Sequence, residues 1–156
     1  MHLLYATAFL AFAVDQLSKL GVVFGLALIR YQSIDVWPPF LNLRMGWNRG
    51  VNFGLLGTAP DMMRWVLILI AVIVSGWLIW WARRSFNRRT QYLAAGLIIG
   101  GALGNALDRV LYGAVADFLN VSCCGIQNPY TFNVADIFIF AGAIALLVLP
   151  VDDKTP

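Results

Sequence analysis

The stretch from residue 100 to residue 136 decides the fold, and it reads GGALGNALDRVLYGAVADFLNVSCCGIQNPYTFNVAD. It opens in a glycine-rich apolar segment and closes where the last apolar run begins. Asp117 and Asp136 flank a short loop, each within a few residues of a predicted membrane helix end. Carboxylates in or beside hydrocarbon are costly in free energy, so such residues are functional candidates. We therefore predict that Asp117 and Asp136 form a catalytic pair.

The composition indicates an integral membrane protein. The 156 residues are 60% hydrophobic and only 12% charged, with a mean hydropathy of +0.75. A soluble domain of this length could not cover so much apolar surface. Because the apolar runs are continuous rather than alternating, the predicted class is all-α. We expect a single membrane domain over residues 1–156 with four transmembrane helices, at roughly residues 3–29, 62–82, 91–111 and 134–149.

The placement of charge predicts how the helices are oriented. Four arginines and no acid lie in the loop from Arg83 to Arg89, after the second predicted span. Loops of this kind are usually cytoplasmic. Both termini are then cytoplasmic, and segments 30–61 and 112–133 lie outside. The net charge is only +3, with one basic cluster, so no nucleic-acid partner is expected.

The outer segment 30–61 contains a predicted strand. Residues 41 to 48 alternate apolar and polar side chains with a period of two. Leu41, Leu43, Met45 and Trp47 would then face one way, in a small sheet on the membrane surface. Turn chemistry follows from residue 48 to residue 54, with two glycines that allow positive φ. A surface loop with aromatic anchors is the open alternative.

Charged residues inside the first span admit two interpretations. Asp15 and Lys19 are four residues apart, so they share a helix face and can pair. The pair either ties the first helix to its neighbours or lines an active site. Intramembrane charges nearly always face the protein interior, which is compatible with both.

The third span predicts close helix packing. Gly96, Gly100 and Gly104 recur every four residues, so another helix can approach one bare face. Polar residues then follow on the same helix, in the outer third of the membrane. Polar residues from three helices and one loop are thus expected at a similar depth, near the outer boundary of the membrane. They are Asp15, Lys19, Asn105, Asp108, Arg109, Asp117 and Asp136.

The residue inventory limits the chemistry available at this boundary. The only histidine is His2, far from the cluster, and Cys123 and Cys124 are adjacent, which matches no zinc spacing. We expect no metal and no cofactor. In a close carboxylate pair, one group stays protonated while the other acts as a base, which can activate a water against a peptide carbonyl. Alternatively, Asp117 caps a helix or pairs with Arg109, and Asp136 caps the fourth helix.

Five motifs together resemble those of lipoprotein signal peptidases, the bacterial type II signal peptidases. They occur in that family's order and spacing and cover most of the chain, and they begin at residues 15, 48, 101, 115 and 132. The resemblance implies a four-helix inner-membrane aspartyl protease with a small periplasmic β-cradle. It implies a substrate too, namely prolipoproteins cut just before a diacylglyceryl-modified cysteine. Membrane lipid is a further expected partner, and a monomer is expected.

The same resemblance assigns roles to individual residues. Asp117 and Asp136 match the catalytic aspartates. Positions that bind substrate or support the site are matched by Asn48, Gly50, Asn105, Arg109 and Asn133. Structural positions are matched by Asp15, Lys19 and Asp108.

Two residues depart from the family pattern. Asn52 stands where a small residue is expected, and Ile137 stands where a small or polar residue often follows the second aspartate. Both bear on the shape of the pocket and on substrate preference.

Three rival functions belong to other classes. A small transporter would use Asp15, Lys19 and Asp108 as an ion path, but internal repeats are absent from the sequence. A phosphotransferase would use Mg²⁺ and carboxylates, but its multi-aspartate helix motif is missing. A purely structural membrane subunit is disfavoured by the five ordered motifs.

Overall fold

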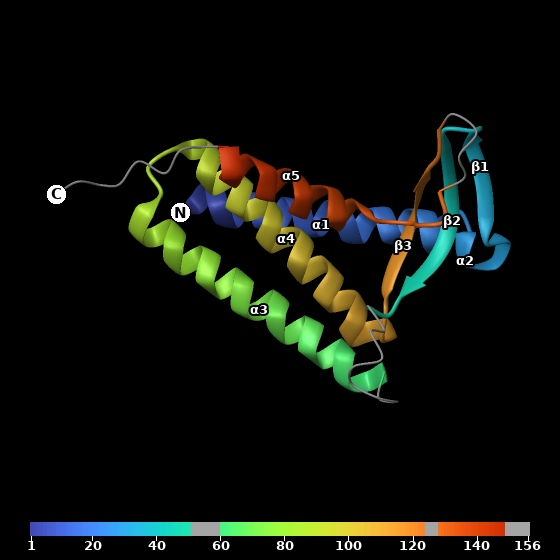
Figure 1. Cartoon of the computed structure of the whole chain (residues 1–156), viewed down its shortest axis with the longest axis horizontal. Helices are drawn as coiled ribbons and strands as arrows, with labels where there is room; N and C mark the ends of the chain where they lie inside the picture. Colours follow the sequence, from blue (N-terminus) through green and yellow to red (C-terminus); the bar gives the residue numbers. More distant parts are fainter. Residues whose placement is uncertain (51–59, 124–127, 149–156) are drawn as a thin grey trace.

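The structure is a computed structural model, and it describes residues 1–50, 60–123 and 128–148. Long helices form a bundle, and a three-stranded sheet lies at one end of it (Figure 1). The helices are α1 (His2–Lys19), η1 (Leu20–Gly25, a π-helical continuation of α1), α2 (Leu28–Tyr31), α3 (Pro60–Ser85), α4 (Arg89–Tyr112) and α5 (Val134–Val148). The strands are β1 (Ser33–Trp37), β2 (Leu41–Asn48) and β3 (Val115–Val121).

Among the described residues, three helices are long and apolar enough to cross a membrane. They cover His2–Gly25, Met62–Ser85 and Arg89–Tyr112. The first stops before the predicted end at residue 29, because Ala27 adopts a left-handed conformation with φ 54° that helices do not continue through. Helix α5 is apolar but has only 15 residues, about 22 Å at 1.5 Å per residue. The described part of α5 is therefore shorter than a hydrocarbon core of about 30 Å.

Helix α4 lies at the centre of the bundle and contacts α1, α3 and α5. The predicted packing of its glycine face is confirmed. A Cβ added to Gly96 would lie 2.8 Å from the Leu4 carbonyl oxygen, and one added to Gly104 would lie 2.6 Å from Asp15 Oδ2, both on α1. Gly101, outside the predicted repeat, packs against α5, where an added Cβ would lie 2.6 Å from the Ala135 carbonyl oxygen. Only glycine permits these approaches, which bring the polar residues of three helices together.

The predicted strand is confirmed as β2, which pairs antiparallel with β1 on one side and β3 on the other. A bulge shifts the register, so that Leu43 lies opposite Leu119 whereas Trp47 lies opposite Ala116. Leu43 and Trp47 therefore lie on opposite faces, and the prediction that all four apolar side chains of β2 face one way is wrong. The extra residue reverses the alternation beyond the bulge. Asn48 consequently shares a face with Asp117.

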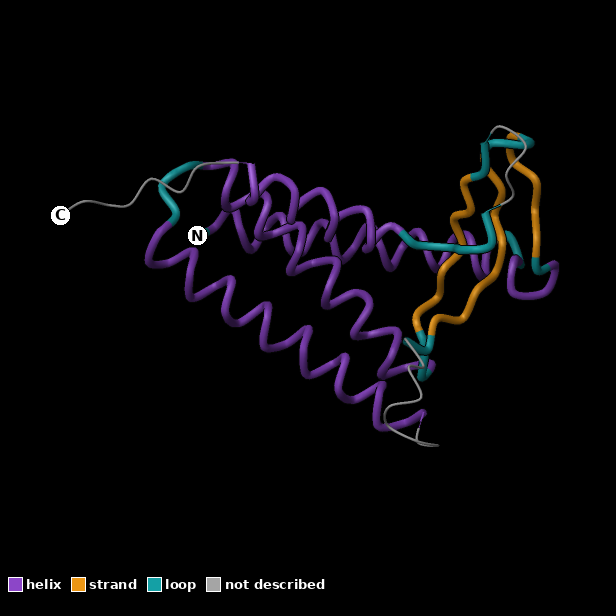
Figure 2. The backbone as a smooth tube through the Cα atoms, viewed as in Figure 1, coloured by secondary structure: helices purple, strands orange, loops and turns teal. Residues whose placement is uncertain are grey.

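The sheet is anchored to one end of the bundle. Figure 2 shows that the strands run across the direction of the long helices, at the end opposite the N-terminus. A buried cluster joins the two parts, formed by Val23 of η1, Leu28 of α2, Leu43 of β2, and Ala116 and Phe118 of β3. Strand β3 was not predicted in segment 112–133. Because of it, Asp117 lies on a strand rather than in a loop.

Two residues noted in the sequence, Asn52 and Cys124, lie outside the described residues. Cys123 is described, and it is not a free thiol. Within the described ranges, no group of three or more His, Cys, Asp or Glu side chains is placed to hold a metal ion.

Candidate active site

Asp117 and Asp136 are both hydrogen-bonded to Asn133. The Asn133 side-chain amide donates to Asp117 Oδ1 at 2.6 Å, and its backbone N–H donates to Asp136 Oδ2 at 3.1 Å. Asp117 comes from β3, and Asp136 from the first turn of α5. Asn133 is fully buried, and Asp117 is 3% exposed. One residue thus connects two carboxyl groups from different elements.

Asp136 also caps α5. Asn133 directly precedes the helix, and its Oδ1 accepts the Asp136 N–H at 3.0 Å while Asp136 Oδ2 accepts the Asn133 N–H. This reciprocal pair is a capping box, which satisfies backbone donors at a helix N-terminus. Asp136 therefore caps the fourth helix, as the alternative interpretation of the sequence proposed. The capping hydrogen bond uses its Oδ2, while its Oδ1 accepts a hydrogen bond from the Asn105 amide at 2.9 Å.

The alternatives for Asp117 are not observed. Asp117 lies within a strand, so it caps no helix. Arg109 donates instead to the Asn105 carbonyl oxygen at 3.1 Å, and no ion pair joins it to Asp117 within the described part of the chain. The Arg109 Nε is buried without a hydrogen-bond partner among the described residues. Arg109 thus brings a positive charge beside the site without pairing directly with Asp117.

Asn48 holds the second oxygen of Asp117. Its amide nitrogen donates to Asp117 Oδ2 at 3.1 Å, and its Oδ1 accepts the Gly50 N–H at 2.9 Å. Because the Gly50 bond uses the amide oxygen, the nitrogen must face the carboxyl group. Gly50 has φ +94°, which side-chain-bearing residues rarely adopt, so glycine is required for this turn.

A buried ionic cluster adjoins the aspartate pair. Lys19 forms salt bridges with Asp15 at 2.8 Å and Asp108 at 2.7 Å. Its Nζ also donates to Asn105 Oδ1 at 3.1 Å. Since that oxygen accepts from Asn133 as well, the Asn105 amide nitrogen is left to face Asp136. The ion pair predicted from sequence is confirmed, and it both ties helices together and contacts the site.

Asp15 and Asp108 each accept a hydrogen bond from the backbone next to Asp136 or Asp117. Asp15 Oδ1 accepts the Ala135 N–H at 2.9 Å, and Asp108 Oδ2 accepts the Ala116 N–H at 3.2 Å. Ala135 directly precedes Asp136, and Ala116 directly precedes Asp117. The cluster therefore positions α5 and β3 relative to α1 and α4.

Gln16 belongs to this cluster and was missed by sequence reasoning. Its side-chain nitrogen lies within hydrogen-bonding distance of Asp15 Oδ2, the Gly104 carbonyl oxygen and Asp108 Oδ1, at 3.1, 3.3 and 3.1 Å. The available signal was its position inside a predicted membrane span, next to Asp15. A polar amide at that depth needs partners within the protein.

Burial changes the acidity of Asp117. Desolvation, followed by the negative charge of Asp136, raises the pKa of Asp117 from 3.8 to about 6. The hydrogen bonds from Asn48 and Asn133 oppose this rise, because they stabilise the ionised form. Asp117 therefore keeps its proton up to a higher pH than an ordinary aspartate does.

An apolar groove leads to the site from the side. It has a volume of about 270 Å³ and lies between α3, α4 and α5, with Leu67, Ile98 and Ile139 among its lining residues. Asn105 and Arg109 line the same groove. An apolar side chain that enters the groove would therefore reach the polar cluster at Asn105 and Arg109.

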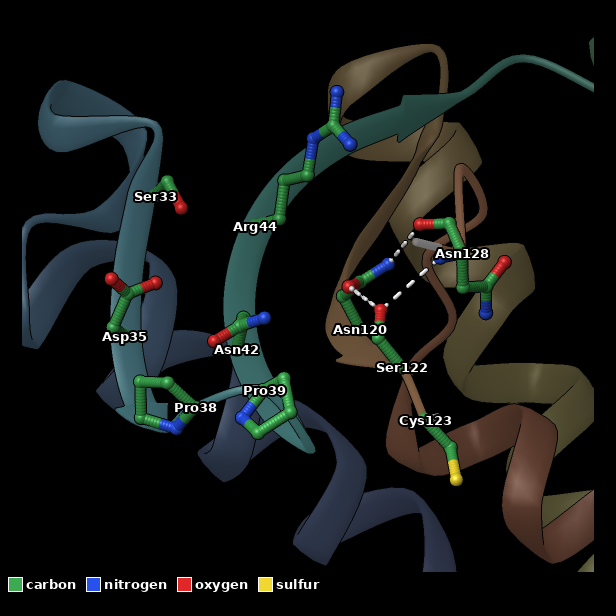
Figure 3. Close-up of a pocket in the computed structure, with 10 residues that line it drawn as sticks. All are labelled: Ser33, Asp35, Pro38, Pro39, Asn42, Arg44, Asn120, Ser122, Cys123 and Asn128. Carbon is green, nitrogen blue, oxygen red and sulfur yellow. Dashed lines mark hydrogen bonds between the residues drawn. The ribbon is translucent and has the colours of Figure 1, made fainter. Parts of the chain in front are cut away.

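A separate polar cavity lies on the sheet. Figure 3 shows Asp35, Asn42 and Asn120 around it, on three neighbouring strands. Neither paired aspartate lines this cavity. The Asn120 amide donates to the carbonyl oxygens of Asn128 and Tyr130, at 2.8 Å each. These bonds fix the segment that leads to Asn133, so this part of the sheet supports the site indirectly.

Comparisons with known proteins agree on one family. A family profile described as Signal peptidase (SPase) II matches residues 7–151. A lipoprotein signal peptidase of Methylobacterium sp. (strain 4-46) is 43% identical over 143 residues, covering 92% of this chain and 85% of that protein. One from Aeromonas hydrophila is 43% identical, covering 91% and 83%. A solved structure titled as a bacterial membrane enzyme has a TM-score of 0.80 at 26% identity, covering 95% of this chain and 92% of that one.

Proposed function

We propose, on the premise that the chain belongs to the signal peptidase II family, that it is an intramembrane aspartyl endopeptidase. It removes the signal peptide of prolipoproteins just before a diacylglyceryl-modified cysteine, using Asp117 and Asp136 and an activated water. The observation that carries this proposal is that Asn133 donates to both carboxyl groups at once.

The two aspartates take different roles in the proposed reaction. Asp136 accepts two N–H donations in the first turn of α5, an arrangement suited to a carboxylate that acts as base. It removes a proton from water, whose oxygen attacks the scissile carbonyl carbon. Protonated Asp117 donates to the carbonyl oxygen, consistent with its raised pKa. As the tetrahedral intermediate collapses, Asp136 gives the proton it took from water to the departing cysteine amine, and a hydroxyl of the intermediate returns a proton to Asp117.

The two hydrogen bonds to Asp136 orient its carboxylate. Asn133 donates its backbone N–H to Oδ2, and Asn105 donates its side-chain amide to Oδ1. Because one donor lies on α4 and the other directly precedes α5, and they bind different oxygens, rotation of the carboxylate would break at least one of the bonds. The proposed base is thus held in one orientation toward the attacking water.

The substrate is expected to approach within the membrane. The groove between α3, α4 and α5 suits apolar side chains on one face of a signal-peptide helix, because its lining is apolar until it reaches Asn105 and Arg109. We propose that α5 completes a four-span topology in the bacterial inner membrane, with both termini cytoplasmic. The sheet and the aspartates then lie on the periplasmic side, and the protein acts as a monomer without a cofactor.

A direct assay tests the proposed function. The purified protein in detergent is incubated with a diacylglyceryl-modified prolipoprotein, and the mature form is measured by mass. An unlipidated version of the same substrate is the control. We expect cleavage of the lipidated substrate immediately before the cysteine. Failure to cleave it would refute the proposal.

The pH dependence follows from the acidity of Asp117. If protonated Asp117 is the competent form, kcat/KM falls as the pH rises through about 6. In Asn48→Ala, a hydrogen bond that stabilises the ionised form of Asp117 is lost, so the pKa of Asp117 rises. The fall in kcat/KM then occurs at higher pH. The measurement is the pH profile of kcat/KM for both proteins. If kcat/KM falls at the same pH in both proteins, protonated Asp117 is not the competent form, whatever the change in absolute rate.

A further inference from the structure

A second face of α5 carries an apolar hollow that reaches Asp136. The hollow has a volume of about 480 Å³, and it is lined by Asp136, Ile137, Phe140, Ala141 and Ile144 together with Phe132. The spacing of three and four residues places these α5 positions on one side of the helix. Phe140 is 70% exposed and Ile137 is 46% exposed, so the described part of the chain leaves this hollow largely uncovered.

This hollow continues along the bundle. A neighbouring hollow of about 600 Å³ shares Ala141 and Ile144 with it, and adds Leu93 and Leu97 of α4. Together they form one apolar furrow, here named the α4–α5 furrow, from Asp136 to Val148. At 1.5 Å per residue the furrow follows α5 for about 18 Å, roughly the depth of one lipid leaflet.

Helix α5 separates this furrow from the groove beside α3. The groove reaches Asn105 and Arg109, whereas the furrow reaches Asp136, so both apolar surfaces end at the same polar cluster. A lipidated prolipoprotein also has two apolar parts near its scissile bond. One is the signal-peptide helix, and the other is the diacylglyceryl group on the adjacent cysteine.

Resting on the proposed function, we infer that the α4–α5 furrow binds an acyl chain of the substrate's diacylglyceryl group. Ile137 and Ala141 would set how well that chain fits. This assigns a role to Ile137, which departs from the family pattern directly after the second aspartate.

The charge at the mouth of the furrow favours this occupant over a bulk phospholipid. Asp136 lines the mouth, and Asp117 is hydrogen-bonded to the same asparagine. A phospholipid seated there would bring its anionic phosphate toward carboxylate charge, which is repulsive. The diacylglyceryl thioether carries no charge. The furrow therefore suits a neutral lipid headed by an ester and a thioether.

The test compares substrates that share one peptide and differ in acyl length, long-chain against dibutanoyl. In Ala141→Trp, the indole would fill the furrow. We expect the ratio of kcat/KM on the long-chain substrate to kcat/KM on the short-chain substrate to fall about tenfold. The change should appear in KM, since lost contact with about two methylenes accounts for a tenfold loss of affinity.

Phe140→Ala, at an exposed position, should lower the same ratio by removing part of the lining. Leu147→Trp is the matched control, because Leu147 lies on α5, is 87% exposed and lines neither hollow.

The outcomes separate the two proposals. If both furrow variants keep the wild-type ratio, or lose activity equally on both substrates, the furrow does not bind the chain and the inference is overturned. If wild-type protein cleaves neither lipidated substrate, the proposed function itself fails. A lowered ratio in the furrow variants with an unchanged ratio in Leu147→Trp supports the inference.

Discussion

Asp117→Asn and Asp136→Asn are each expected to reduce cleavage of a lipidated prolipoprotein by about a thousandfold or more. An asparagine side chain can neither accept the proton of the attacking water nor donate a carboxyl proton to the scissile carbonyl, and each such contribution is worth roughly a hundredfold to ten-thousandfold. Single-turnover rates measured with excess purified enzyme would detect this loss. Asp35→Asn is the matched control, because Asp35 is an exposed carboxylate on β1 away from the pair.

Thermal unfolding distinguishes lost chemistry from lost folding in these variants. The pKa of Asp117 is raised on folding, so its favourable contribution to stability is complete below pH 3.8 and is lost as the pH rises through about 6. The amide introduced by Asp117→Asn does not titrate, so it has no such pH dependence. The Tm of Asp117→Asn relative to wild type should therefore be higher at pH 8 than at pH 5. Substantial turnover by either folded variant would show that the pair is not catalytic.

Lys19→Met is expected to destabilise the protein by about 3–5 kcal/mol. The change leaves Asp15 and Asp108, which are 0% and 1% exposed, buried without their shared cation. These aspartates hold the backbone N–H groups of Ala135 and Ala116, so the residues beside both catalytic candidates should loosen as well. Unfolding in detergent, followed by heat or denaturant, measures the loss.

A double variant tests the cause of that loss. Adding Asp108→Asn to Lys19→Met removes one of the two uncompensated charges, so part of the stability should return. Arg44→Met is the control, because Arg44 is an exposed cation on β2. Equal destabilisation by Lys19→Met and Arg44→Met would argue against the buried ionic cluster.

Local patterns in the sequence were sufficient for much of the fold. Continuous apolar runs predicted the long helices, and period-two alternation predicted β2 with the bounds observed. The glycine repeat predicted close approach to α4, and the spacing of Asp15 and Lys19 predicted their ion pair. These features depend on residues close together in the chain, which is why the sequence contains them.

Other features depend on which residues meet across the chain. Strand β3 escaped prediction because its residues are mostly buried, so it lacks the alternation that identified β2. The bulge that brings Asn48 to the face of Asp117 arises only when β2 pairs with β3. The second ion pair of Lys19, with Asp108, and the inclusion of Gln16 also required two helices to be placed side by side.

The sequence by itself determined which side chains could do chemistry here, since it contains a single histidine, no usable metal spacing and two aspartates near the ends of predicted helices. The tertiary structure decided how those aspartates differ. Asp117 is desolvated on a strand, Asp136 caps a helix, and Asn133 connects them. Acidity depends on burial and on neighbouring charge, and both are properties of the folded chain rather than of residue order.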